Sequence, residues 1–457
     1  MKEMELTGKR VLVVGLARTG VAAARFLAAR GARVTVSEQR PADAFAAELA
    51  ALQPLGVEVE CGGHSEARFL AADLIVPSPG VPLTLPALAA ARGKGIEIIS
   101  ELELAWRFLR GTVVAVTGSN GKTTTVSLLG KIFADAGRRV QVGGNIGTPL
   151  IHLVESARDD SVNVVEVSSF QLEAITSFRP RVAALLNITP DHLDRHAAMG
   201  EYVAAKARLF GYQRGDDFAI FNADDHTCAE LAPEVRAQRF WFSRRRGLDV
   251  GTFLRDDWVV FANGPQQESV LPRQEIPLLG AHNLENVLAA VCAARLLEVP
   301  AAAIRRAVAG FGGVEHRLEF VAEIDGVRYY NDSKATNVDA AVKALEAFPG
   351  NLLVILGGKD KGGDFRPLQT LLRERARRAL LIGAAREKIA GHLGESVPTE
   401  ILETLPEAVA RAAELAAPGD VVLLAPACAS FDQFENFEHR GRVFKDEVQR
   451  LALKKVH

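Results

Sequence analysis

The chain has 457 residues, of which 48% are hydrophobic and 24% charged, with a net charge of −2, as in a globular enzyme of about three domains. The balanced charge argues against a nucleic-acid partner, and no stretch of about 18 uninterrupted apolar residues predicts a membrane span. The four cysteines lack metal-ligand spacing and the N-terminus lacks a signal-peptide pattern, so we expect a reduced, cytoplasmic protein.

Strands and helices alternate in the first segment, residues 1–104. This alternation predicts a parallel sheet with helices on its faces. The apolar runs that carry the prediction cover residues 10–14, 33–37 and 74–76 for strands and residues 21–29 for a helix.

The turn after the first predicted strand reads Gly15-Leu16-Ala17-Arg18-Thr19-Gly20 and resembles a dinucleotide-binding fingerprint. Glu38 closes the second strand at about the distance that this fingerprint requires. However, Ala17 replaces the middle glycine, which lets a pyrophosphate approach the backbone. The turn therefore fits a nicotinamide site, a looser phosphate site such as that for a nucleotide attached to a sugar, or a plain strand–helix connection.

The second segment, residues 105–314, carries Thr117-Gly118-Ser119-Asn120-Gly121-Lys122-Thr123-Thr124 between an apolar strand and an amphipathic helix. A strand, a glycine-rich turn and a helix N-terminus form an anion cradle, because backbone N–H groups and the helix dipole favour phosphate. Lys122 would reach the terminal phosphates and the Thr123 hydroxyl would bind magnesium. A strict phosphate loop has a glycine where Val116 stands, but the context still predicts an ATP site.

A carboxylate interrupts the β-branched run at residues 163–167. Glu166 is costly to bury there unless it is paired or bound to a metal. Beside a phosphate loop, its natural role is to hold magnesium, directly or through water. The alternative is a solvent-facing position on an edge strand.

Further polar groups follow in the same segment. A dense cluster, residues 187–196, ends a strand predicted over residues 182–188, at the edge where open α/β sheets bind ligands. In it, His192 suits a substrate contact or an oxygen-rich metal site better than a zinc site. Lys206 lies between alanines on a predicted helix, which is typical of a solvated position. Asn283 shares a helix face with a second asparagine and either caps that helix or contacts an adenine edge.

The third segment, residues 315–457, returns to strand–helix alternation, with parallel strands predicted over residues 352–356, 379–382 and 421–424. Polar or glycine-rich clusters lie beside these elements. The clusters are residues 331–337, residues 357–364, which place two lysines in a loop suited to a carboxylate or phosphate, and residues 426–432.

Together these motifs resemble the Mur ligase family, the ATP-dependent amide-forming enzymes of peptidoglycan precursor synthesis. The resemblance extends over essentially the whole chain, and a series of motifs in the right order is far more specific than any one of them. It rests on residues 118–124, 143–147, 166–173, 191–196, 282–283, 316–317 and 331–337. The last motif and residues 430–437 look most like the member that adds D-glutamate to UDP-N-acetylmuramoyl-L-alanine.

The resemblance implies an α/β protein of three domains, with Rossmann-like N-terminal and C-terminal domains around a central P-loop ATPase-like domain. The implied boundaries are residues 1–104, 105–314 and 315–457. It also implies ATP and two magnesium ions as cofactors and a carbamylated Lys206. Nothing in the sequence demands more than a monomer, and the need to shield an acyl phosphate from water predicts domain closure about hinges near residues 104 and 314.

The same resemblance implies site residues, position by position. The catalytic residues are Lys122, His192 and Lys206, and the metal ligands are Thr123, Glu166, His192 and Lys206. ATP contacts are Gly118, Ser119, Asn120, Gly121, Lys122, Thr123, Thr124, Asn283, Arg317 and Asp332. The UDP-substrate contacts are Arg18, Thr19, Arg40, Ser78, Gly80, Asn145, Ser168 and Gln171, and the D-glutamate contacts are Lys334, Thr336, Lys361, Ser430 and Phe437.

Three other functions compete with this interpretation. A folylpolyglutamate-type ligase shares the central loop but has no UDP-binding first domain, and the region from Gly15 to Gly80 argues against it. A nicotinamide-dependent oxidoreductase would use the first glycine-rich turn, which Ala17 makes a poor match. A nucleotide-gated binding module without chemistry would leave Glu166 and His192 incidental.

Overall fold

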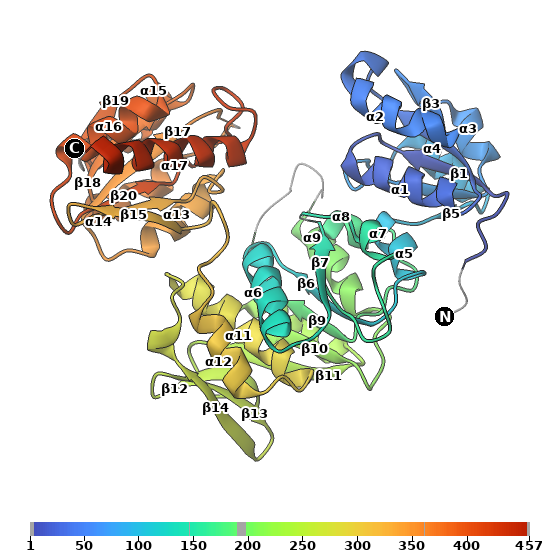
Figure 1. Ribbon diagram of the computed structural model, residues 1–457, viewed down its shortest axis with the longest axis horizontal. Coiled ribbons are helices and arrows are strands. Elements are labelled where there is room, and N and C mark those ends of the chain that lie inside the picture. Colours follow the sequence, from blue (N-terminus) through green and yellow to red (C-terminus); the bar gives the residue numbers. More distant parts are fainter. Residues whose placement is uncertain (1–3, 146, 190–197, 361, 455–457) are drawn as a thin grey trace. The chain divides into compact units, whose positions relative to one another are not determined.

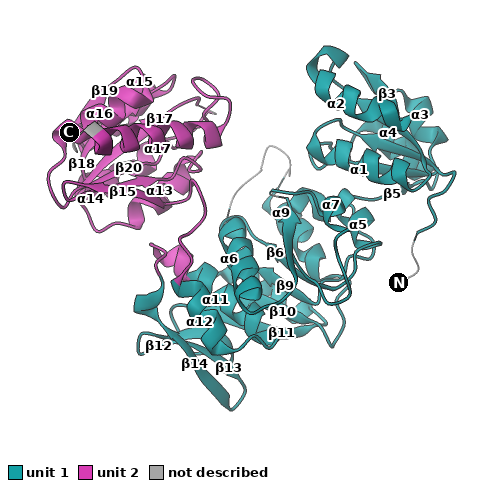
Figure 2. Cartoon of the chain, viewed as in Figure 1, with its two compact units in different colours: residues 1–276, 285–309 teal, residues 277–284, 310–457 magenta. Residues whose placement is uncertain are grey.

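The computed structural model describes residues 4–145, 147–189, 198–360 and 362–454 (Figure 1). In this part of the chain the strands form three sheets. The chain divides into two compact units, one of residues 1–276 and 285–309 and one of residues 277–284 and 310–457 (Figure 2). The first unit contains two of the sheets, and the second unit contains the third.

The first sheet is parallel throughout, with the strand order β3-β2-β1-β4-β5 of a doubly wound fold. In β1, Val13 packs in one core with Leu27 of α1, whereas Leu12 packs in another with Phe69 of α3, so helices cover both faces. The elements are β1 (Arg10–Val14), α1 (Arg18–Ala29), β2 (Arg33–Glu38), α2 (Ala46–Leu52), β3 (Glu58–Cys61), α3 (Glu66–Ala71), β4 (Leu74–Pro77), α4 (Pro86–Gly93) and β5 (Glu97–Ile98).

The strands predicted in this segment are confirmed, with β1 ending at the predicted residue. The helix predicted from Val21 begins earlier, at Arg18. Its first turn, Arg18-Thr19-Gly20, contains no apolar residue, so the apolar periodicity that predicted the helix begins one turn after the helix itself.

The second sheet has the order β14-β13-β12-β11-β10-β9-β6-β8-β7. Its strands pair in parallel from β12 to β7, while β13 and β14 add antiparallel pairs at one edge. The strands are β6 (Thr112–Thr117), β7 (Val140–Gly144), β8 (Val162–Glu166), β9 (Val182–Leu185), β10 (Phe218–Asn222), β11 (Gln238–Ser243), β12 (Val250–Arg255), β13 (Trp258–Asn263) and β14 (Gln266–Pro272).

Helices pack on this sheet, and α6 contacts both β8 and α12. The helices are α5 (Glu101–Trp106), α6 (Lys122–Asp135), α7 (Leu150–Leu153), α8 (Ser169–Leu172), α9 (Met199–Ala207), α10 (His226–Leu231), α11 (Ala281–Leu296) and α12 (Ala301–Ala309). Strand β9 ends at Leu185, before the predicted end at Ile188. The amide of Ile188 instead donates to Asp225 Oδ2, and that of Thr189 donates to Ser119 Oγ, so this segment leaves the ladder to brace the phosphate loop.

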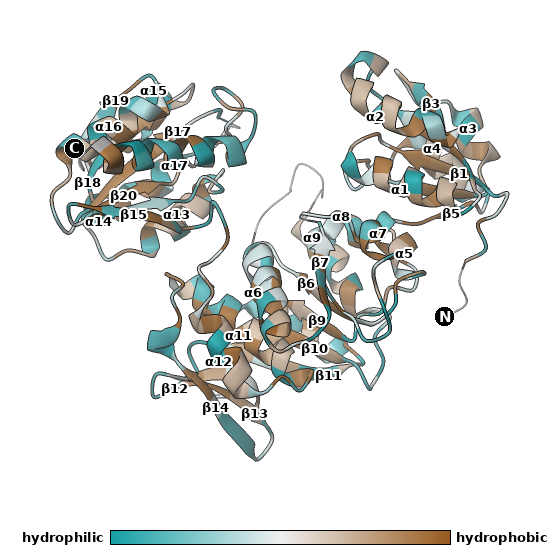
Figure 3. Cartoon of the chain, in the orientation of Figure 1, coloured by the Kyte–Doolittle hydropathy of each residue, from teal (hydrophilic) through white to brown (hydrophobic). Residues whose placement is uncertain are grey.

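The third sheet has the order β15-β16-β20-β17-β18-β19, antiparallel between β15 and β16 and parallel elsewhere. Ile355 of β17 packs with Phe444 of α17, whereas Val354 packs with Leu345 of α13, so helices again cover both faces. Figure 3 shows apolar strands inside this unit. The elements are β15 (Glu319–Ile324), β16 (Val327–Asn331), α13 (Val338–Glu346), β17 (Leu352–Gly357), α14 (Gln369–Arg375), β18 (Ala376–Ile382), α15 (Arg386–Leu393), β19 (Thr399–Ile401), α16 (Leu405–Leu415), β20 (Val421–Leu424) and α17 (Phe437–Lys454).

One hydrophobic core runs through the first unit and includes residues of both of its sheets. Helix α5 lies in it, with Leu102 and Leu104 fully buried. On the same helix, the buried carboxylate of Glu103 accepts hydrogen bonds from the amides of Thr176, Ser177 and Phe178 at 2.9–3.0 Å. The segment after the first sheet is thus packed tightly against the second. Among the helices of the described residues, none has the length and apolarity needed to cross a membrane.

Candidate active site

The glycine-rich loop lies between β6 and α6, as predicted, with Lys122 as the first residue of the helix. Gly121 precedes that helix with a φ of 85°, in the left-handed region that favours glycine. A Cβ at Gly121 would also overlap Oδ1 of Asn286, which lies on α11. Both the backbone conformation and the close approach of α11 therefore require glycine here.

The loop is braced by the segment after β9. The amide of Asn120 donates to Asn187 Oδ1 at 2.8 Å, and Asn187 Nδ2 donates back to the Asn120 carbonyl at 3.1 Å. The Ser119 hydroxyl donates to the Thr189 carbonyl at 2.9 Å. The first residues of the polar cluster predicted after this strand therefore shape the loop. Its members from Pro190 to His196, including His192, lie outside the described residues.

Two lysines contact the same loop carbonyl. Lys122 Nζ donates to the carbonyls of Gly118 and Ser119 at 2.7 and 2.8 Å. Lys206 Nζ donates to the Gly118 carbonyl at 2.9 Å, and it lies 4.6 Å from the centre of the Tyr202 ring. Lys206 is only 1% exposed, so the local interpretation of it as a solvated helix position is wrong. Helix α9 packs this side chain under the loop, which the flanking alanines could not indicate.

Glu166 lies at the end of β8, between β6 and β7, and is 2% exposed. The alternative of a solvent-facing position on an edge strand is therefore wrong. Its Oε2 accepts from the Thr123 hydroxyl at 2.9 Å, and its Oε1 accepts from Asn145 Nδ2 at 2.9 Å. A buried carboxylate and a hydroxyl at a helix N-terminus are hard oxygen donors of the kind that magnesium prefers, so these residues fit that ion.

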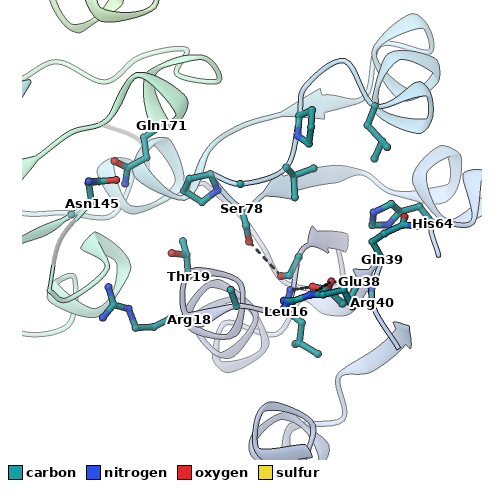
Figure 4. A pocket seen from close by; sticks show the side chains of 18 residues that line it. Leu16, Arg18, Thr19, Glu38, Gln39, Arg40, His64, Ser78, Asn145 and Gln171 are labelled. Carbon is teal, nitrogen blue, oxygen red and sulfur yellow. Dashed lines mark hydrogen bonds and ion pairs between the residues drawn. The ribbon is translucent and has the colours of Figure 1, made fainter. Parts of the chain in front are cut away.

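The first unit also contains a cavity of about 590 Å³ at the carboxyl ends of β1, β2 and β4 (Figure 4). It brings together seven of the eight residues predicted for the UDP-substrate, from both sheets of the unit: Arg18, Thr19, Arg40, Ser78, Gly80, Asn145 and Gln171. The eighth, Ser168, is not among the lining residues. It caps α8 instead, because its hydroxyl accepts from the Gln171 amide at 3.3 Å and the Gln171 side chain bonds back to it.

The floor of this cavity is built around the first turn. The carboxylate of Glu38 accepts from the Leu16 amide at 2.8 Å and from the Arg40 amide at 3.1 Å. Burial acts to raise the pKa of Glu38, but these backbone N–H groups and the Arg40 guanidinium outweigh it and hold the pKa below its usual value. Glu38 therefore ties the turn to the end of β2 as an anion, and Arg40 lies 4.3 Å over the Phe45 ring beside it.

Helix α1 begins at this cavity with no side-chain cap at Ala17 and no acidic residue in its first turn. Its N–H groups and dipole are thus available to an anion. Arg18 and Thr19 add a guanidinium and a hydroxyl at the same end. The cavity therefore has the chemistry of a phosphate-bearing ligand, and Ala17 does not obstruct it.

In the second unit, the three residues predicted to contact the nucleotide are Asn283, Arg317 and Asp332. Asp332 is buried, and burial raises the pKa of its carboxyl to about 7, against the opposing charge of Arg317. The amide of Leu318 donates to Asp332 Oδ1 at 3.3 Å. Asn283 Nδ2 donates to the Leu279 carbonyl at 2.7 Å. Through the bond from Leu318 to Asp332, the His316–Arg317 motif is held beside the end of β16.

The residues predicted for D-glutamate follow the carboxyl ends of the third sheet's parallel strands, where such sheets bind ligands. Lys334 and Thr336 come after β16, and Ser430 comes after β20. Phe437 begins α17, and Lys334 Nζ lies 3.7 Å from the centre of its ring. Lys361 lies outside the described residues.

One residue of this region was missed at the sequence level. Arg440 of α17 is 1% exposed and hydrogen-bonds to the backbone at Ser333, Cys428 and Ala429. A signal for it exists, because Arg440 stands four residues before Phe444 on the apolar face of the helix. A charged residue at such a position is buried only with specific partners.

Three domain models match the chain in order: the Mur ligase MurD-like N-terminal domain at residues 9–100, the Mur ligase middle domain at residues 116–294, and the Mur ligase glutamate ligase domain at residues 316–428. Among solved structures, a pseudomurein peptide ligase type C from Methanothermus fervidus shares the fold, with a TM-score of 0.59 and 20% identity, covering 97% of this chain and 100% of that one. The UDP-N-acetylmuramate–alanine ligase of Thermotoga maritima also has a TM-score of 0.59, with 18% identity, covering 97% and 99% of the two chains.

The chain therefore belongs to the Mur ligase family, in its UDP-N-acetylmuramoylalanine–D-glutamate ligase branch. It is 57% identical to the ligase of that name from Acidobacterium capsulatum, with 97% of each chain covered. It is 52% identical to the one from Koribacter versatilis, with 98% of this chain and 99% of that one covered. The three-domain α/β fold inferred from the motifs is confirmed.

Proposed function

We propose that this chain joins D-glutamate to the L-alanyl carboxyl group of UDP-N-acetylmuramoyl-L-alanine, with ATP converted to ADP and phosphate, in peptidoglycan precursor synthesis. The observation that carries the proposal is the end-to-end similarity to ligases named for this reaction, at 57% identity over 97% of the chain. The phosphate loop and the cavity at α1 supply sites of the chemistry that ATP and a UDP-sugar require.

A carboxylate is a poor acyl donor, so phosphorylation must supply a leaving group. In the first step the substrate carboxylate attacks the γ-phosphate, which gives an acyl phosphate and ADP. In the second step the neutral amine of D-glutamate attacks the activated carbonyl, and a tetrahedral intermediate expels phosphate. The work of the protein is mainly alignment and charge neutralisation.

In this scheme Lys122 leaves the carbonyls of Gly118 and Ser119 and donates to the terminal phosphates. Thr123 and Glu166 would hold magnesium, which neutralises the charge of the polyphosphate when it is bound. His192 would complete a second magnesium site or orient the substrate carboxylate. Asn145, which contacts Glu166 and also lines the UDP cavity, links the two substrates.

Carbamylation of Lys206 is part of the proposal. Burial of Lys206 at the loop supports it, because a protonated lysine cannot coordinate a metal ion and a carbamate would supply an anionic oxygen ligand there. A carbamate there would also have a cation beside it, since Lys122 donates to the same carbonyl as Lys206. We further propose that the enzyme acts in the cytoplasm, which the nucleotide substrates and the four free cysteines support. We propose a monomer because no step of the scheme needs a second chain.

The test is phosphate release from ATP and magnesium with UDP-N-acetylmuramoyl-L-alanine while the added amino acid is varied. Release that requires D-glutamate, and fails with L-glutamate, L-lysine and diaminopimelate, is expected. Release with a different amino acid would place the enzyme elsewhere in the family, and no release with any of them would overturn the proposal.

A pair of lysine variants tests the phosphate site. Lys122→Ala should abolish phosphoryl transfer and leave the fold intact. Lys131→Ala is the matched control, because it removes a lysine of the same helix whose ion pair, among the described residues, is with Asp135, away from the loop. Near-normal turnover of Lys122→Ala would contradict the assignment of this loop to ATP.

A further inference from the structure

The buried guanidinium of Arg440 has an unusual set of partners. Nη2 donates to the carbonyls of Ser333 and Cys428 at 2.8 and 3.1 Å, Nη1 to the carbonyl of Ala429 at 3.3 Å, and Nε to the Ser333 hydroxyl at 3.0 Å. Among the described residues, no carboxylate accepts a hydrogen bond from it. Burial lowers the pKa of this guanidinium to about 10, so it remains a cation at neutral pH.

The partners of Arg440 lie directly beside the residues proposed to hold the amino acid. Ser333 precedes Lys334, and Ala429 precedes Ser430. The Ser333 hydroxyl also donates to the carbonyl of Phe437 at 2.8 Å, so the start of α17 joins the same network. One side chain thus connects the three segments that carry Lys334, Ser430 and Phe437.

The segment before Ser430 is held in a conformation that an isolated chain would avoid. Ala427 has a φ of 58°, which is unfavourable for a residue with a Cβ. The amide of Lys359 donates to the Ala429 carbonyl at 2.8 Å, and the amide of Ala429 donates to the Lys359 carbonyl at 3.2 Å. Strain of this kind persists only where surrounding contacts enforce it, and Arg440 contacts the two residues that follow Ala427.

We propose that Arg440 is a positioning residue for the incoming amino acid. It holds the loops of Ser333 and Ala429 against the start of α17, so that Lys334, Ser430 and Phe437 face one ligand. Asp432 offsets this charge in part through space, but no described carboxylate accepts a hydrogen bond from Arg440, so its charge still favours an acceptor with anionic carboxylates. This inference rests on the proposed function, because it assumes that these three residues contact D-glutamate.

The next residue provides a contrast within the same helix. A Cβ at Gly441 would overlap Nδ1 of His316, which lies in the motif predicted for the nucleotide. Asn331 Nδ2 donates to that same nitrogen at 2.9 Å. Adjacent positions of α17 therefore support different motifs. Arg440 contacts the loops that carry the residues proposed for D-glutamate, whereas Gly441 packs against His316 of the motif predicted for the nucleotide.

The experiment measures phosphate release by Arg440→Lys, Arg440→Met and Gly441→Ala, with KM and kcat determined for each of the three substrates. Arg440→Lys keeps the positive charge but loses the planar guanidinium, whose three nitrogens donate to separate acceptors. We therefore expect the KM for D-glutamate to rise about tenfold and the KM for ATP to stay nearly unchanged. Arg440→Met should raise it further, by about a hundredfold, because it leaves several carbonyls without a donor. Gly441→Ala should show the reverse pattern and raise the KM for ATP.

A merely structural role predicts something different. A lower thermal midpoint with all three KM values raised equally would overturn the inference, as would Lys and Met variants with the same KM for D-glutamate as the wild type. Should Arg440→Met fail to fold, Arg440→Lys decides by the same criterion. Wild-type protein that releases phosphate without D-glutamate would instead refute the proposed function, so the two failures are distinguishable.

Discussion

Replacement of Glu166 by glutamine separates the structural and chemical roles of this carboxylate. Glu166 accepts one hydrogen bond from Thr123 and one from Asn145, each at 2.9 Å. A glutamine can accept from Asn145 with its oxygen and donate to the Thr123 hydroxyl with its nitrogen. The free energy of unfolding should therefore change by less than about 1 kcal/mol. Alanine removes both acceptors and leaves a cavity at a buried position, which should cost about 2–5 kcal/mol.

The activity should respond in a different way. Glutamine removes the negative charge that a magnesium ion requires, so turnover should fall at least about a hundredfold, or roughly 3 kcal/mol of transition-state stabilisation. Urea unfolding of Glu166→Gln and Glu166→Ala gives the stabilities, and D-glutamate-dependent phosphate release gives turnover. A glutamine variant with more than about a third of wild-type turnover would refute the metal-binding role. A glutamine variant destabilised as strongly as the alanine variant would refute the reasoning about the two hydrogen bonds.

Three further changes test other parts of the site. Lys206→Ala should lose activity and recover some of it when short carboxylic acids are added to the phosphate-release assay, and full activity without them would rule out a required carbamate. Gly121→Ala should raise the KM for ATP at least about tenfold, because its φ of 85° and the nearby Asn286 leave no room for a methyl group; an unchanged KM would contradict this close approach. Glu101→Gln should reduce the pH dependence of stability. Burial raises the pKa of Glu101 from 4.5 to about 7, so the folded chain holds this proton to higher pH than the unfolded chain, and wild-type stability should fall by about 3 kcal/mol as the pH rises through this window. Urea unfolding of both proteins at pH 4.5 and 8 measures the difference, and parallel changes would refute it.

The phosphate loop could be predicted from sequence because its elements are contiguous. An apolar strand, glycines and a helix all lie within about one βα unit, so spacing alone places Lys122 and Thr123 at the helix start. Glu166 was also detectable, since a carboxylate in a β-branched run conflicts with burial unless it has a partner. In both cases a local rule carries the information.

Lys206 and the cavity at the start of α1 cannot be predicted by such local rules. The burial of Lys206 depends on how α9 packs under a loop almost ninety positions earlier in the chain, and its flanking alanines are compatible with either environment. The cavity joins Arg18 from the first sheet to Asn145 and Gln171 from the second, and no spacing along the chain relates them. For these residues the prediction rests on the resemblance to a family, because periodicity carries no information about them.

The continuous core of the first unit has a consequence for how the protein melts. Because α5 and both sheets share that core, heat should unfold the cavity at α1 and the phosphate loop in one cooperative step. The second unit, with its own cores on either side of the third sheet, should give a separate calorimetric transition. A ligand bound only in the cavity would then raise the melting temperature of the phosphate loop as well, without touching it.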